Sequence, residues 1–331
     1  MNDIFLQAFS GAFSAILKIA LVVIAVALLR RKQIITDAHL KGLATTIIAL
    51  LLPCMIFTNL IKNFDPSQMP NWWIVPIGSF VIMVIGVGAG LILFRKSLPE
   101  KKEMLNLCGI HNGGYLVLPL IHHLFPDNHK LYELYTFLFI IMLFPLIWSL
   151  GKYLTCPIAS ENGFSFKALF TPPFWANIFG LAIILIGWTK YIPETIVDGA
   201  SLLGEGTIPV VMVILGGSLG SITFSLKGFI RDALSTIAVK LILVPGAVLA
   251  IVLLTPLSQI LPNTLCLFFV IQAACPPSTA TLIQLQHYGG NLQKNGSIII
   301  LHYLAIIITL PFWIALYSLF TPAMDLTKIG P

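Results

Sequence analysis

The chain has 331 residues, of which 57% are hydrophobic and only 10% are charged, and its net charge is +6. Soluble domains carry about 25% charged residues, so this composition excludes a water-soluble globular protein. The excess of positive charge is placed around apolar segments and predicts membrane topology rather than a nucleic-acid partner.

The apolar residues form blocks long enough to cross a hydrocarbon core of about 30 Å. The first block begins near Phe9 and lacks the basic start and cleavage site of a signal peptide, so it is predicted to be a retained helix. Breaking the chain at Pro, Gly and charged clusters predicts ten spans: 9–29, 39–61, 72–94, 102–125, 132–154, 168–189, 195–219, 229–254, 263–286 and 296–320. We therefore predict an all-α membrane protein with ten transmembrane helices.

Basic residues are distributed unequally over the predicted loops. One set of alternate loops, with the ends of the adjoining spans, holds thirteen Lys and Arg residues, the opposite set holds four, and Lys18 and Lys240 fall deep inside spans. Cytoplasmic loops are enriched in Lys and Arg, which predicts that both termini lie outside. The predicted location is the plasma membrane, which in a bacterium is the inner membrane.

Ten spans divide into two halves of five, and an odd number inserts the second half in the opposite sense. Residues 1–155 are the first predicted repeat, 156–166 a short cytoplasmic linker, and 167–331 the second repeat. Prolines recur at nearly the same offset in the two halves: Pro53 with Pro209, and Pro119 with Pro276. Inverted repeats are a common plan of secondary transporters.

The fourth and ninth spans contain the residues that most disfavour a continuous helix. The fourth reads Asn112-Gly-Gly-Tyr-Leu-Val-Leu-Pro119, and the ninth contains Pro276-Pro277. Gly costs about 1 kcal/mol and Pro about 3 kcal/mol relative to Ala inside a helix. Unpaired backbone groups are tolerated at membrane depth only inside protein or beside a wet cavity. We predict that both helices are broken and cross near the midplane, where half-helix N-termini favour an anion.

The predicted substrate-binding residues lie at these two breaks and on the eighth span: Asn112, Gly113, Gly114, Tyr115, Pro119, Gln272, Pro276, Pro277, Ser278, Thr279 and Lys240. Lys240 is predicted to supply positive potential, with snorkelling or capping of a broken helix as the alternative. Lys18 and Glu205 reach similar depth and are predicted to pair, since an intramembrane charge needs a partner or a function. For His122, His123 and His129 a metal site is the less favoured interpretation, so neither a metal nor a cofactor is predicted.

Several stretches resemble the auxin efflux carrier family across essentially the whole chain. They are Leu28–Ile35, the Asn112-Gly-Gly run ending in Pro119, Ala273–Thr281, Tyr288-Gly-Gly-Asn291 and Thr309-Leu-Pro311. With no long loop between its halves, the chain looks most like the compact microbial permeases, which are related in plan to the sodium–bile acid symporters. The segment Asn71–Pro76 lacks the Asp and Lys that plant relatives carry there. The resemblance therefore does not imply a proton or ion site at this position of the chain.

The resemblance implies a scaffold of helices 1, 2, 6 and 7 and a moving unit of helices 3–5 and 8–10. It also implies transport of small organic anions such as auxin-like acids, malonate or malate. We therefore predict a secondary transporter of a mono- or dicarboxylate that works by an elevator-type alternating-access motion. Its partners are the organic anion and membrane lipid, with a homodimer left open.

An enzyme is not predicted, since the chain has no HExxH motif and no clustered intramembrane acids of the kind that hydrolysis would need. It also has no P-loop, so the energy for transport must come from gradients or from a partner. The alternatives are a sodium-coupled organic-anion symporter of the bile acid symporter type, a passive channel and a non-transporting membrane sensor.

Overall fold

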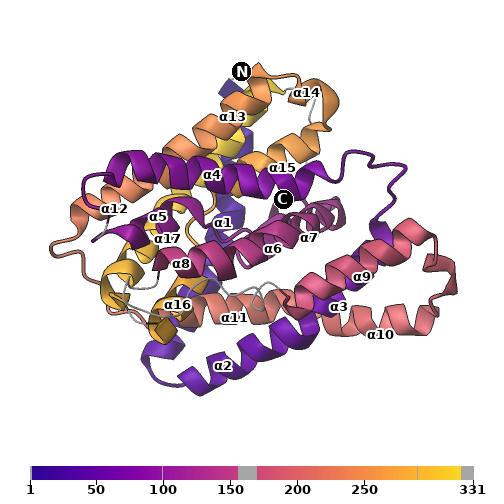
Figure 1. The fold of residues 1–331 in the computed structure, drawn as a ribbon, viewed down its shortest axis with the longest axis horizontal. Coiled ribbons are helices and arrows are strands. Elements are labelled where there is room, and N and C mark those ends of the chain that lie inside the picture. The colour runs from indigo at the N-terminus through magenta and orange to yellow at the C-terminus, as the bar shows by residue number, and fades with distance from the viewer. Residues whose placement is uncertain (1, 99, 156–169, 289, 322–331) are drawn as a thin grey trace.

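The computed structural model describes residues 2–98, 100–155, 170–288 and 290–321, and these are almost entirely helical (Figure 1). The first half of the chain forms eight helices: α1 (Asn2–Arg31), α2 (Asp37–Thr46), α3 (Leu52–Asn63), α4 (Ile74–Phe94), α5 (Lys102–Gly109), α6 (Val117–Leu124), α7 (His129–Leu146) and α8 (Lys152–Thr155). Single π-helical turns join α2 to α3 (Ile47–Leu51) and α7 to α8 (Ile147–Gly151). The predicted linker 156–166 lies outside the described residues.

The second half forms nine helices within the described residues: α9 (Pro172–Ile186), α10 (Glu194–Glu205), α11 (Thr207–Gly220), α12 (Ile230–Ile237), α13 (Val244–Leu254), α14 (Leu257–Ile260), α15 (Asn263–Ala274), α16 (Ala280–Tyr288) and α17 (Leu292–Phe320). A π-helical turn (Ala238–Leu243) joins α12 to α13.

Seven helical segments in the described part of the chain are long and apolar enough to cross a membrane: Asp3–Arg31, Asp37–Asn63, Ile74–Phe94, His129–Thr155, Glu194–Gly220, Ile230–Leu254 and Leu292–Phe320. They coincide with seven of the ten predicted spans. The sixth predicted span corresponds to the shorter α9, and the fourth and ninth are each divided between two short helices. These segments confirm the prediction of an all-helical protein that crosses the membrane several times.

Local sequence explains several helix ends. Thr36 accepts a hydrogen bond from the backbone N–H of His39 at the start of α2, and Thr171 accepts one from Phe174 at the start of α9. Such caps satisfy backbone donors that have no partner within the helix. At the end of α9, Gly187 adopts φ +79°, a left-handed conformation that favours glycine.

The helices form two groups around α1. α2, α3, α9, α10 and α11 lie together along the lower side of Figure 1, and α4, α12, α13 and α15 along its upper side. α1 packs against α11 of the first group and against α17. Gly220 allows this close approach on α11, because a Cβ added there would lie 2.7 Å from the carbonyl oxygen of Ala27. Small residues permit such backbone contact between membrane helices.

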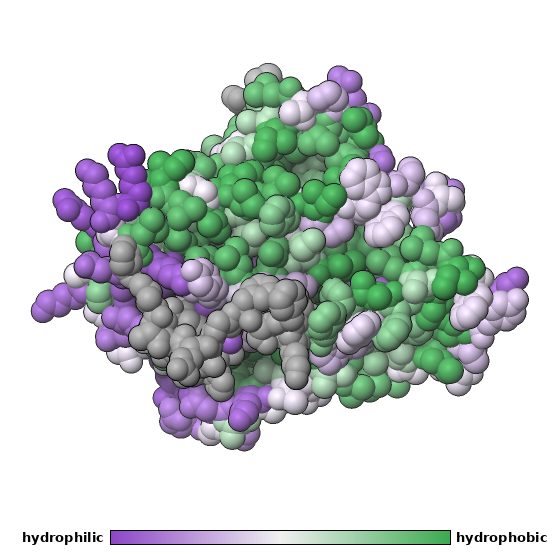
Figure 2. Space-filling view, in the orientation of Figure 1, coloured by the Kyte–Doolittle hydropathy of each residue, from purple (hydrophilic) through white to green (hydrophobic). Residues whose placement is uncertain are grey.

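The surface is consistent with a lipid environment. Figure 2 shows hydrophobic residues over most of the visible face, while hydrophilic residues gather beside the ends of α4 and α12 and over α2. Leu202, Ile92 and Leu254 are 74%, 74% and 85% exposed, which water would disfavour and hydrocarbon tolerates.

Candidate functional site

Two non-helical segments meet inside the bundle. α5 ends at Gly109 and α6 begins at Val117, while α15 ends at Ala274 and α16 begins at Ala280. The backbone N–H of Asn112 donates to the carbonyl oxygen of Pro276 at 2.9 Å, and that of Ser278 donates to Ile110 at 3.1 Å. His111 and Pro277 thereby form an isolated antiparallel bridge, which we call the crossover.

Prolines and glycines explain why the helices stop here. Pro276 and Pro277 have no N–H and so cannot continue the hydrogen-bond ladder of α15. Gln272 then donates through Nε2 to the carbonyl oxygen of Gly113 at 3.1 Å, which ties the two segments together a second time. A Cβ on Gly113 would overlap Gln272 Oε1 and lie 2.9 Å from Leu143 Cδ2. A side chain at position 113 would therefore require Gln272 and Leu143 to shift.

A cavity of about 280 Å³ lies against the crossover. Its lining includes six of the predicted site residues: Asn112, Gly113, Gly114, Tyr115, Ser278 and Thr279. Other lining residues come from helices that the sequence analysis does not connect with the site, among them Trp148, Thr171 and Ser218. No Lys, Arg, Asp or Glu occurs among the described residues that line it. Any charge on a ligand must therefore be met by dipoles and hydrogen bonds.

Backbone donors are available in this wall. Within the described residues, the amides of Gly113, Gly114 and Tyr115 donate no hydrogen bond to the protein. They precede the first turn of α6, where the helix dipole is positive. Free amides at a helix N-terminus are suited to bind an anion.

The cavity adjoins a second one of about 480 Å³. Four residues line both cavities: Ala44, Ile214, Ser218 and Ile283. Asp37 and Lys41, which follow the basic segment 30–32, also line the second cavity. The second cavity thus lies between the crossover cavity and the face that carries Asp37 and Lys41.

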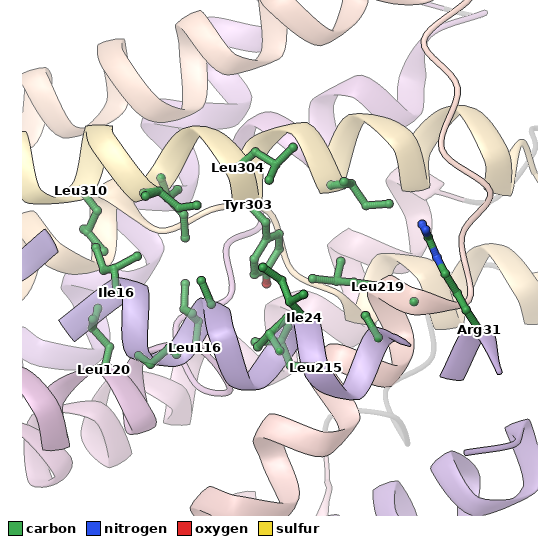
Figure 3. A pocket seen from close by; sticks show the side chains of 18 residues that line it. Ile16, Ile24, Arg31, Leu116, Leu120, Leu215, Leu219, Tyr303, Leu304 and Leu310 are labelled. Atoms are coloured by element: carbon green, nitrogen blue, oxygen red, sulfur yellow. The ribbon is translucent and has the colours of Figure 1, made fainter. Parts of the chain in front are cut away.

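Tyr303 of α17 connects the crossover to a separate apolar cavity. Its hydroxyl accepts a hydrogen bond from Asn112 Nδ2 at 2.6 Å. Figure 3 shows the Tyr303 side chain among Ile16, Ile24, Leu116 and Leu215, which line a cavity of about 170 Å³ between α1, α6, α11 and α17. Sequence reasoning missed Tyr303, because its partner lies 191 residues away along the chain.

Lys240 lies behind the crossover rather than in the cavity. Its side chain is fully buried, and Nζ donates to the carbonyl oxygen of Ala273 at 3.3 Å. Ala273 is in the last turn of α15, where carbonyls lack helical partners and the dipole is negative. This geometry agrees with the alternative interpretation, in which Lys240 caps a broken helix. It does not agree with direct contact between Lys240 and a ligand in the cavity.

The prolines and Gln272 support the crossover but are not among the described residues that line the cavity. Gln272, Pro276 and Pro277 make or flank its hydrogen bonds. Pro119 lies in the first turn of α6, where a proline removes no helical hydrogen bond. The interruption therefore falls at residues 110–116 and not at Pro119, which corrects the prediction that the helices cross at both prolines.

The predicted pair of Lys18 and Glu205 is wrong. No ion pair joins them among the described residues, and both side chains are exposed. The reason is packing: α1 lies against α11 and α17, whereas Glu205 ends α10 and lines a cavity between α3, α7 and α10. Equal depth along two helices did not place the two side chains face to face.

Buried polar contacts also hold the ends of α5, α12 and α17 together. Asp232 forms ion pairs with Lys101 at 2.7 Å and with Lys294 at 3.2 Å, and Lys294 also pairs with Glu103 at 3.2 Å. Asn106 Oδ1 accepts a hydrogen bond from Thr281 at 2.9 Å, which links α5 to α16. These polar contacts hold the helices that surround the crossover together.

The run Gly216-Gly-Ser-Leu-Gly220 matches the Gly-x-Ser-x-Gly pattern of many hydrolases. In those enzymes the serine lies on a sharp turn between a strand and a helix. Here the run lies inside α11, and a Cβ on Gly216 would lie 2.6 Å from the carbonyl oxygen of Val23. The glycines thus serve the contact between α1 and α11 and do not form a nucleophile turn.

Comparison with known proteins agrees with this architecture. The family described as "Membrane transport protein" matches residues 12–162 and 156–314. An uncharacterized transporter of Methanothermobacter thermautotrophicus is 24% identical over 244 residues, which cover 72% of this chain and 77% of that protein. Another from Methanocaldococcus jannaschii is 25% identical over 197 residues, or 56% of this chain and 62% of that protein.

A plant protein is also similar. Protein PIN-LIKES 2 of Arabidopsis thaliana is 27% identical over 125 residues, which cover 37% of this chain and about a quarter (27%) of the plant protein. The archaeal relatives are named as transporters, in agreement with the prediction that the chain is not an enzyme. Since the family match extends over most of the residues, the chain belongs to the membrane transport protein family, the auxin efflux carrier family that its motifs resemble.

Proposed function

We propose that the protein is a secondary transporter that moves a small organic anion, a mono- or dicarboxylate, by an elevator-type alternating-access motion. The observation that carries the proposal is the crossover. Two interrupted helices from opposite halves of the chain are joined by the Asn112–Pro276 and Ser278–Ile110 hydrogen bonds, beside a cavity lined by free amides. Broken helices at a repeat interface are the usual binding site of secondary transporters.

We propose two inverted repeats, residues 1–155 and 167–331, joined by 156–166. Support comes from the order of the elements in the two halves. In each half a long segment with a local break (α2–α3, α10–α11) is followed by a long segment (α4, α12–α13), a divided one (α5–α6, α15–α16) and a last long one (α7–α8, α17). The divided helices hold the fourth place both times, as an inverted repeat requires.

We further propose that α1–α3 and α9–α11 form the scaffold and that α4–α8 and α12–α17 form the moving unit. Packing supports the division, because α3 contacts α9 and α10, while α4 contacts α5 and α7, and α15 contacts α17. α1 meets α17 and α6 across the apolar cavity of Figure 3. This part of the boundary is largely apolar, so sliding of one unit past the other would break few polar contacts there.

The proposed anion is bound by dipoles and not by an ion pair. The amides of Gly113, Gly114 and Tyr115 are free, and Asn112, Ser278 and Thr279 add polar side chains to the same wall. Lys240 adds positive potential from behind the crossover, because no acid forms an ion pair with it among the described residues. Such a site holds a carboxylate without a permanent counter-ion in the cavity.

We place the protein in the plasma membrane with both termini outside. The support is the distribution of Lys and Arg over alternate loops. On this orientation the cavity lined by Asp37 and Lys41 lies on the cytoplasmic side of the crossover cavity.

Counterflow in proteoliposomes tests the proposal. Vesicles loaded with unlabelled malate, malonate or an indole monocarboxylate are diluted into the labelled compound, with the Asn112→Ala variant as the comparison. A carrier accumulates label transiently in the wild-type vesicles and much less in the variant. Sodium and proton gradients, each imposed alone, distinguish the symporter alternative from other coupling.

Two results would overturn the proposal. Label that only equilibrates, at a rate unchanged by unlabelled compound inside, indicates a channel. Thermal stabilisation by an anion with no flux of that anion indicates a sensor, since ligand binding stabilises the folded state whether or not transport follows.

A further inference from the structure

A cluster of metal-ligating side chains lies away from the crossover, at the junction of α6 and α7. His122 is on the last turn of α6, while His129 and Glu133 are four residues apart on α7 and so share one face of that helix. One ligand atom from each of the three lies within 4.8 Å of the others. The loop 125–128 between the helices folds His129 back against His122, and their ring centroids are 4.5 Å apart.

Two members of this trio, Glu133 and His129, already make outer hydrogen bonds. Glu133 Oε2 accepts from Asn59 Nδ2 of α3 at 2.8 Å, and Oε1 faces His122 Nε2. His129 Nδ1 bonds the carbonyl oxygen of Pro126 at 2.8 Å, which leaves Nε2 as its free atom. Metal-bound histidines nearly always donate their second ring N–H to a carbonyl or carboxylate, and ligating carboxylates are themselves hydrogen-bonded.

The surroundings leave room and access for an ion. A cavity of about 260 Å³ borders all three residues, and Glu205 lines it as a second acid. Of the lysines in the same lining, Lys62 has its charge paired with Asp198 at 3.0 Å. Glu133 is nearly buried, so a cation bound there is attracted by a carboxylate that water screens weakly.

We propose that His122, His129 and Glu133 form a Zn²⁺ site with a fourth position open to the cavity. Two imidazoles and one carboxylate are a donor set that Zn²⁺ uses, with water or another ligand completing a tetrahedron. Mg²⁺ and Ca²⁺ prefer sites built from oxygen atoms alone. The three ligands share no residue with the crossover cavity, so loss of Zn²⁺ binding and loss of anion binding can be told apart.

Zn²⁺ titration of the purified full-length protein, with any affinity tag removed, tests the proposal. Competition against a chromophoric chelator in detergent measures affinity and stoichiometry. We expect one Zn²⁺ per chain, no competition by Mg²⁺ or Ca²⁺ at the same concentration, and a higher melting temperature with Zn²⁺.

His129→Gln and Glu133→Gln should each weaken Zn²⁺ binding at least tenfold, because each removes a direct ligand. His123→Gln is the matched control, since His123 is adjacent to His122 but outside the cluster, and it should bind as the wild type does. Glu133→Gln keeps an acceptor for Asn59, and the melting temperature without metal checks that each variant folds. Absence of stoichiometric binding in the wild type, or equal binding by the wild type and a folded His129→Gln variant, would overturn the site.

Discussion

Gln272 and Gly113 are 159 residues apart in the chain, yet the Gln272 amide donates to the Gly113 carbonyl at 3.1 Å in the interior of the bundle. Gln272 is fully buried and packs directly over the Gly113 backbone. This contact joins the interrupted segments from the two halves next to the candidate binding cavity. The geometry of the cavity therefore depends on position 113 having no side chain.

Gly113→Ala should damage both stability and transport. The new Cβ overlaps Gln272 Oε1 and crowds Leu143, and overpacking of this kind costs roughly 1–3 kcal/mol. We expect a lower melting temperature in detergent and at least a tenfold loss of counterflow rate. Gly88→Ala on α4 is the control, because a Cβ there meets nothing within 4 Å and Gly88 does not line the cavity. Equal behaviour of the two variants would contradict the packing argument.

Tyr303→Phe should weaken anion binding without unfolding the protein. The change removes the acceptor of the 2.6 Å hydrogen bond from Asn112 and keeps the ring that packs in the apolar cavity. One hydrogen bond contributes about 1 kcal/mol, which corresponds to roughly fivefold in Kd. Ligand-induced thermal stabilisation measures the change. Tyr191→Phe, at a position 70% exposed, should leave affinity unaltered, and a Tyr303→Phe variant with wild-type affinity would argue against a role for Asn112 orientation.

Lys240→Met should reduce affinity for carboxylates and spare the fold. A unit charge at about 10 Å in an effective dielectric of about 20 contributes about 1.7 kcal/mol, so we expect a loss of roughly tenfold or more. The Met side chain fills the same buried space, although the Ala273 carbonyl loses its donor. Lys18→Met, at an exposed position, is the control. Unchanged affinity in Lys240→Met would limit Lys240 to capping α15.

Gly220→Ala should destabilise the contact between α1 and α11. Its Cβ would lie 2.7 Å from both Cα and the carbonyl oxygen of Ala27, and backbone atoms cannot rotate away as a side chain does. We expect a cost of roughly 1–3 kcal/mol, seen as a lower melting temperature. Gly199→Ala on α10 meets nothing within 4 Å and should be neutral or stabilising by up to about 1 kcal/mol. A lower melting temperature for Gly199→Ala than for Gly220→Ala would show that α1 and α11 are not in backbone contact.

Lys18 and Glu205 should show no energetic coupling. Since no ion pair joins them in the described structure, the effects of Lys18→Ala and Glu205→Gln on unfolding should add within about 0.5 kcal/mol. A double-mutant cycle of melting temperatures or denaturation midpoints makes the comparison. If one substitution instead relieves the destabilisation caused by the other, the two side chains interact, and the packing of α1 and α10 described above is wrong.

Local chemistry was enough to predict seven of the ten spans as long apolar helices, and it drew attention to the two segments where the backbone is not helical. Long apolar runs can be satisfied only by crossing lipid, and Pro276-Pro277 and Gly113-Gly114 cannot sustain a helix wherever they lie in the fold. For the same reason, six of the predicted site residues line the cavity at the crossover. Pro119 was misassigned because a proline in the first turn of a helix is harmless, and only the true start of α6 reveals that it lies there.

Contacts between distant segments were decided by the tertiary structure alone. Depth along a helix is readable from sequence, but the direction in which a side chain points depends on which neighbours each helix packs against. Because of these directions, Lys18 and Glu205 point to different neighbours, and Lys240 lies against the end of α15. For the same reason Tyr303 contacts Asn112, and His122 contacts Glu133. The sequence by itself determined where the chain enters lipid and where its helices stop, because both follow from solvation and backbone hydrogen bonding within a segment. The tertiary structure alone decided which polar groups share a cavity. Helix packing brings these groups together, and the sequence of one segment does not show which other segments pack against it.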